Sequence, residues 1–453
     1  MARRKLHHRR NGKLGISGPN ADPDGDGVTN LFEHAFAGKP KNSLSGSTPV
    51  VGSVPVDSQE RLTLTFTPQV LTGLKYYIEV SNDLVSWTTA ADITSLLTVG
   101  VPYTFIDTVD LLTAPRRFAL LRVELQAPET GTARTIPVGG VEMKITAGTN
   151  SAKVSTPLSA PLVSQVSISG RRQGILTGVS SNTLSSTGAG WTPGALATAA
   201  NPHLVRILTG NAAGYTFLIG ANTADTLTLH TADAALVDLS TLGIITSGPN
   251  ADRFQILPCD TLLSLLGTPG TNDVQGGTTA AAADTVAVFS PHLGNHTYFY
   301  HTGSNQWVRN TPGFPAANNT PIRPETGLVY QRLKNATIRQ VYLGTVPHTA
   351  RRVFVRNSGS TLLSSGWPTN VNLSAANITA ITGWVSNSSP AVADIVGLGI
   401  MNYFHDGTNW RRQSFGNPIA NPQISFSSSI LLNKKGTATG HSILLQNLPY
   451  TLP

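Results

Sequence analysis

Arg61-Leu62-Thr63-Leu64-Thr65-Phe66 alternates apolar and polar residues, and Tyr76-Tyr77-Ile78-Glu79-Val80 and the segment 118–125 are further strand-like runs. Turn residues such as Ser81-Asn82-Asp83 separate the runs. Alternation with a period of two between turn residues is typical of strands that bury one face. We therefore predict a β-sandwich over residues 46–128.

The composition extends this prediction to the whole chain. Of its 453 residues, 40% are apolar and only 12% are charged, while Gly (43) and Pro (29) supply frequent turn signals. Low charge with many hydroxyl and amide side chains disfavours helices and suits sheets and loops. The length corresponds to roughly two to four domains. We predict an all-β chain of several β-sandwich or small-barrel domains, with one short helix near the N-terminus.

A diverged repeat occupies the larger, C-terminal part. The first copy contains Ala283-Asp284-Thr285-Val286, Tyr298-Phe299 and Trp307, and the second contains Ala393-Asp394-Ile395-Val396, Tyr403-Phe404 and Trp410. We predict a β-domain at 135–345 with an inserted small barrel at about 165–257, followed by its repeat at 346–453. The copies read equally as two similar domains or as two halves of one pseudo-symmetric domain.

The segment Asp22-Pro23-Asp24-Gly25-Asp26-Gly27-Val28-Thr29-Asn30-Leu31-Phe32-Glu33 fits the calcium-loop pattern D-x-D-x-D-G-x-x-N-x-x-E. Carboxylates at alternate positions converge on one cation only if the chain turns sharply, and Gly27 permits that turn. Calcium prefers about six to eight hard oxygen ligands, which this loop can supply. The predicted calcium ligands are Asp22, Asp24, Asp26, the carbonyl of Val28, Asn30 and Glu33. We place residues 1–45 in one unit, comprising a basic arm, this loop and a short helix after it.

Residues 19–38 resemble a thrombospondin type 3 or dockerin-like calcium repeat. The β-domain after it carries Val80-Ser81-Asn82-Asp83-Leu84 and Arg116-Arg117-Phe118 features, and residues 135–453 resemble an uncharacterised family of exported bacterial proteins. The resemblance implies an extracellular or cell-surface location. True dockerins carry two calcium loops and bind a cohesin; only one loop is found here, which argues against that partner.

The first thirteen residues carry six Lys or Arg and no acid. Such an arm can hold nucleic acid, anionic lipid or an acidic partner, or it can be a solvated tail. It lacks the apolar core of a signal peptide, and no window is apolar enough for a membrane span. The one cysteine, Cys259, permits no intramolecular disulfide.

Catalytic signatures are missing from the sequence. It contains no G-x-S-x-G, H-E-x-x-H or phosphate-binding Walker motif. His292, His296 and His301 cluster, but we expect surface histidines rather than a zinc site. Trp307 and Trp410 occupy equivalent places in the repeats, where each either stacks on a sugar ring or anchors a core. We expect no enzyme activity.

These observations lead to three functional hypotheses. The first is an extracellular calcium-binding structural protein that self-associates as a subunit of a filament, appendage or surface layer. The second is a surface module that binds extracellular polysaccharide through Trp307 and Trp410. The third is a viral or phage shell protein whose basic arm meets nucleic acid; the calcium repeat argues against this hypothesis.

Overall fold

A computed structural model describes residues 18–23, 27–39, 49–165, 168 and 170–453. The fold is all-β, with many antiparallel sheets and few short helices, as predicted. The basic arm at residues 1–13 lies outside the described residues. Among the helices of the described part, none is long and apolar enough to cross a membrane.

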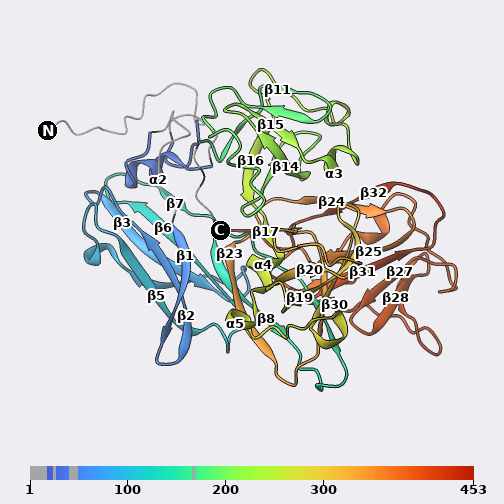
Figure 1. Ribbon diagram of the computed structural model, residues 1–453. Helices are drawn as coiled ribbons and strands as arrows, with labels where there is room; N and C mark the ends of the chain where they lie inside the picture. The colour runs from blue at the N-terminus through green and yellow to red at the C-terminus, as the bar shows by residue number, and fades with distance from the viewer. Residues whose placement is uncertain (1–17, 24–26, 40–48, 166–167, 169) are drawn as a thin grey trace.

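Two sheets form the N-terminal sandwich (Figure 1). The outer sheet has the order β1-β2-β5 and the inner sheet the order β23-β8-β6-β3-β4, with β7 also paired to β6. The outer strands are β1 (Val50–Val56), β2 (Gln59–Phe66) and β5 (Tyr103–Asp110). The inner strands are β3 (Leu74–Ser81), β4 (Thr88–Asp92), β6 (Arg116–Leu125), β7 (Thr132–Arg134), β8 (Val138–Ile145) and β23 (Ile338–Thr345), and η1 (Thr94–Leu96) follows β4.

The inner sheet continues past residue 128, where we expected the sandwich to end. β8 pairs with β6 on one side and with β23 along its whole length on the other, so that strands of the first repeat complete the sandwich. Phe118 belongs to the core shared with the first repeat, whereas Leu121 faces the sandwich core. Burial on both faces explains why residues 118–121 are a continuous apolar run rather than an alternating one.

The two repeats have the same strand order. The first forms a sheet β20-β19-β18-β22-β9, and the second a sheet β29-β28-β27-β31-β25. Smaller pairs also correspond, with β8–β23 matching β24–β32 and β17–β21 matching β26–β30.

The remaining bounds of the first repeat are β9 (Val154–Leu158), β17 (Asp260–Thr261), α4 (Leu262–Leu266), α5 (Pro269–Asn272), η3 (Ala280–Ala282), β18 (Thr285–Ser290), β19 (Gly294–His301), β20 (Gln306–Arg309), β21 (Pro321–Ile322) and β22 (Leu328–Arg332). Those of the second are β24 (Arg351–Arg356), β25 (Gly359–Ser364), β26 (Val371–Asn372), η4 (Leu373–Ala375), η5 (Ile378–Ala380), β27 (Ile395–Leu398), β28 (Met401–His405), β29 (Trp410–Arg412), β30 (Gln423–Ile424), β31 (Ser429–Lys434) and β32 (His441–Gln446).

The repeats share part of one core. Trp367 and Tyr450 of the second copy lie in the same buried cluster as Trp307 of the first. At the seam, Ser159 N–H donates to the Ser427 carbonyl at 2.9 Å, and Gly327 N–H donates to the Leu362 carbonyl at 3.2 Å. The two copies therefore contact each other through buried side chains and backbone hydrogen bonds.

A separate module is inserted between β9 and β17. Its strands form a seven-stranded sheet in the order β10-β16-β13-β14-β15-β12-β11 (green in Figure 1). Within the described residues the path ends at β10 and β11 and does not close into the small barrel that we expected. The bounds are β10 (Gln173–Ile175), β11 (Gly178–Val179), β12 (Thr183–Ser185), β13 (His203–Ile207), β14 (Thr216–Asn222), β15 (Thr226–Leu229), α3 (Thr231–Ala234), η2 (Leu239–Thr241) and β16 (Arg253–Pro258).

A buried aspartate anchors each repeat. The carboxylate of Asp284 accepts hydrogen bonds from Gln275 N–H and Leu333 N–H, at 2.8 and 2.7 Å. The equivalent Asp394 accepts from Val385 N–H and Lys435 N–H, at 2.9 and 2.6 Å. Both aspartates are fully buried, so each joins the loop before its hairpin to the strand end beside it.

We predict that Asp394→Asn lowers the free energy of unfolding by about 2–4 kcal/mol, because a buried backbone donor would then face an amide NH₂ instead of an oxygen. Denaturant titration of the transition that contains the repeats measures the effect. The control is Asp92→Asn at the exposed end of β4, where the carboxylate accepts a hydrogen bond from Thr94 N–H at 3.1 Å and where we expect a loss of about 1 kcal/mol or less. Equal losses in the two variants would contradict the anchoring role.

Candidate calcium site

Four of the six predicted calcium ligands are described. Asp22, Val28, Asn30 and Glu33 have described positions, whereas Asp24 and Asp26 lie outside the described residues. Within the described part, no group of three or more His, Cys, Asp or Glu side chains is arranged to hold a metal ion. The described part of the loop comprises its two ends, residues 22–23 and 27–33.

Backbone hydrogen bonds close the ends of the loop onto each other. Asn30 N–H donates to the Ala21 carbonyl at 2.8 Å, and Leu31 N–H donates to the Pro19 carbonyl at 2.9 Å. The Asn30 side-chain amide also donates from Nδ2 to the Gly18 carbonyl at 2.9 Å. These bonds bring the start of the loop, at Asp22, beside Asn30.

Gly27 has the left-handed backbone conformation that the motif requires at its sixth position. Its φ is +86°, a value that L side chains rarely adopt. Its N–H donates to Oδ2 of Asp22 at 3.0 Å, so the residues at the first and sixth positions of the motif are in contact. The carboxylate at position one and the glycine at position six are therefore placed as a tight cation loop requires.

The helix α2 (Asn30–Ala35) holds the other end of the loop. Its apolar side chains Leu31, Phe32 and Ala35, with Phe36 after it, are buried in the core of the N-terminal sandwich. Gln69 N–H donates to the Ala35 carbonyl at 2.9 Å and ties the helix end to the sandwich. The position of the loop is thus set by the packing of α2.

The same packing places two predicted ligands. Asn30 is 4% exposed and Glu33 is 0% exposed, in the first turn of α2. The Glu33 carboxylate carries two hard oxygens, the type of ligand that calcium prefers. Burial lowers the pKa of the neighbouring His34, which favours its neutral form.

The inserted module supplies two contacts that the sequence did not predict. Arg253 Nη2 lies 2.7 Å from Oδ2 of Asp22. The side chain of Gln173 covers Gly27, where an added Cβ would lie 2.5 Å from Oε1. Both residues are far from the loop in sequence and match no motif, so no local pattern could have found them.

The two candidate stacking residues, Trp307 and Trp410, are buried. Trp307 is 0% exposed, and its indole N–H donates to the Gly267 carbonyl at 2.8 Å. Trp410 is 7% exposed and packs against Trp384 with ring centroids 6.0 Å apart. Neither ring offers an open face to a sugar. Both tryptophans are instead core residues, the alternative to sugar stacking that the sequence left open.

The histidine cluster also differs from the expectation. The side chain of His292 is buried, and its Nδ1 lies 2.6 Å from Oδ1 of Asp233 in the inserted module, so the prediction of a surface histidine is wrong there. Arg323 Nη2 lies 2.8 Å from both oxygens of Asp233. Burial acts to raise the pKa of Asp233, but Arg323 and His292 outweigh it and hold that pKa at about 2. The carboxylate thus joins the inserted module to the first repeat.

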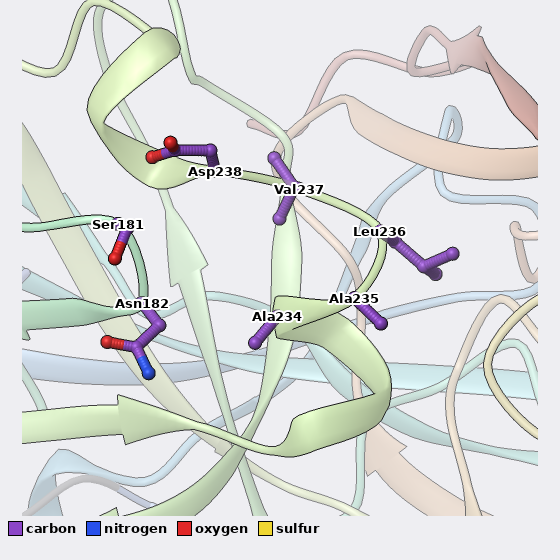
Figure 2. A pocket seen from close by; sticks show the side chains of 7 residues that line it. All are labelled: Ser181, Asn182, Ala234, Ala235, Leu236, Val237 and Asp238. Carbon is purple, nitrogen blue, oxygen red and sulfur yellow. The ribbon is translucent and has the colours of Figure 1, made fainter.

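A shallow hollow of about 440 Å³ lies on the inserted module. Figure 2 shows its lining, with polar groups from Ser181, Asn182 and Asp238 and apolar side chains from residues 234–237. Oδ1 of Asp238 accepts a hydrogen bond from Ser240 N–H at 3.0 Å, which caps a short helix. The hollow offers neither an aromatic platform nor a pair of carboxylates.

No known family, curated protein or solved structure matches this chain.

Proposed function

We propose that this chain binds one calcium ion in the loop 22–33 and serves as an extracellular structural protein, a subunit of a cell-surface assembly. The observation that carries the calcium proposal is the closed loop at the start of α2. Asp22 is folded onto Gly27, and Asn30 and Glu33 are held at the other end by a helix buried in the sandwich.

The ion would have a structural role. Asp24 and Asp26 of the sequence motif would add carboxylates to Asp22 and Glu33, and the Val28 carbonyl and Asn30 would complete an oxygen shell of the kind that calcium prefers. Such an ion offsets the mutual repulsion of the acidic side chains. Because α2 packs into the sandwich, a calcium ion bound there would tie the segment before it to the sandwich.

An exposed apolar tip on the second repeat supports the assembly part of the proposal. Ile400 is 94% exposed in the turn between β27 and β28, and Phe415 after β29 is fully exposed. The two segments run side by side, since Gln413 N–H donates to the Asn402 carbonyl at 2.9 Å. Large apolar side chains exposed together favour contact with another protein surface.

We predict that isothermal titration calorimetry detects one calcium ion per chain. Asp22→Asn should weaken binding at least about tenfold, because a ligand charge is lost. Glu33→Gln should weaken calcium binding further, since a carboxylate able to bind through two oxygens is replaced. If Glu33→Gln impairs folding because the residue is buried, Asp22→Asn still tests the site. Glu129→Gln on an exposed turn is the matched control. If all variants bind calcium with the affinity of the unchanged protein, the ion binds outside the loop 22–33.

Negative-stain electron microscopy tests the assembly. We expect purified protein to form regular filaments or sheets in calcium and to lose them in excess chelator, with magnesium unable to restore them. Ile400→Ser together with Phe415→Ser should reduce assembly while calcium binding persists. Monodisperse monomers with and without calcium would rule out the assembly proposal and leave calcium binding to be judged by calorimetry.

A further inference from the structure

One face of the inserted module lies against the calcium loop. In the β10–β16 pair, Gln173 stands opposite Gln255 and Ile175 opposite Arg253. Side chains two residues apart on a strand share a face, so Arg253 lies on the same face of the sheet as Gln173. Figure 1 shows β16 on the side of the module that faces the blue segment containing α2.

Two side chains of that face meet the two ends of the turn. Arg253 reaches Asp22 and Gln173 covers Gly27. The same oxygen, Oδ2 of Asp22, accepts from Gly27 N–H at 3.0 Å and from the Arg253 guanidinium at 2.7 Å. The first ligand of the proposed calcium site is thus also the partner of a guanidinium from the inserted module.

A guanidinium in this position opposes a divalent cation in two ways. It takes up a carboxylate oxygen that the ion needs, and its charge would lie only a few ångströms from the ion, where a double positive charge is repelled twice as strongly as a single one.

We propose that Arg253 competes with calcium for Asp22. The contact of the inserted module with the loop and the binding of calcium in the loop therefore weaken each other. The inference rests on the proposed calcium site and adds its regulation. Coupling between two binding events is reciprocal. The contact between Arg253 of β16 and Asp22 lowers the affinity for calcium by a certain factor. Bound calcium therefore weakens that contact by the same factor.

Arg253 is a suitable residue to change. Its side chain is 32% exposed, and an ion pair so accessible to water adds little to stability. Its backbone N–H donates to Thr209 Oγ1 at 2.8 Å, a bond that any side chain leaves in place. We therefore expect Arg253→Gln to fold normally, which circular dichroism and thermal melting can check.

Calorimetric titration with calcium compares the full-length chain with two variants. Arg253→Gln should bind calcium about tenfold more tightly at low salt, and the gain should shrink as ionic strength rises. Arg339→Gln removes the same charge from a pair with Glu142 on the sandwich sheet, and it should change affinity less than about twofold. In the unchanged protein, hydrogen exchange in β10 and β16 should speed up when calcium is added.

The outcomes separate this inference from the proposed function. If the unchanged protein binds calcium and Arg253→Gln binds it equally or more weakly, Arg253 is no competitor and the calcium site stands. If no form of the protein binds calcium at millimolar concentrations, the proposed function fails and the competition fails with it. If Arg339→Gln binds calcium as tightly as Arg253→Gln does, the gain in affinity comes from net charge alone. That result would overturn the specific role of Arg253.

Discussion

The burial of one face of α2 in the N-terminal sandwich is the contact on which the candidate site depends. Leu31, Phe32, Ala35 and Phe36 join the sandwich core, and burying a large apolar side chain contributes about 1.5–3 kcal/mol. That energy holds a helix of six residues, which is too short to be stable alone in water. The packing of α2 consequently fixes the positions of Asn30 and Glu33 in its first turn.

The candidate calcium loop contacts three parts of the chain. Its exit helix belongs to the sandwich, its entry residues bond back to that helix, and its turn touches the inserted module through Arg253 and Gln173. The inner sheet of the sandwich in turn includes β8 and β23 from the first repeat, and the repeats share a core. A change at the loop can therefore be transmitted to the module and sandwich that it touches, through packed contacts rather than through a flexible linker.

Local sequence pattern predicted the parts of this structure that depend on local chemistry. Alternation at 61–66 and 76–80 corresponds to β2 and β3, and Gly27 in the motif has the positive φ that the turn needs. The sequence similarity of the repeats corresponds to two sheets of one strand order.

Contacts between segments that are distant in sequence could not be predicted from local sequence pattern. The pairing of β8 with β6 and β23, and that of Arg253 with Asp22, depend on the tertiary fold, since neither has a characteristic spacing. Burial of Asp284 and Asp394 was also missed. A short Ala-Asp step repeated in both copies was the available signal, but a polar residue before a strand more often marks an exposed turn.

Long-wavelength anomalous diffraction from crystals grown in calcium tests the central claim most directly. We expect one calcium peak at the loop, with oxygens of Asp22, Asn30 and Glu33 and the Val28 carbonyl at about 2.3–2.6 Å. Crystals that show no anomalous peak at the loop in saturating calcium, or show the ion bound elsewhere on the chain, would contradict it.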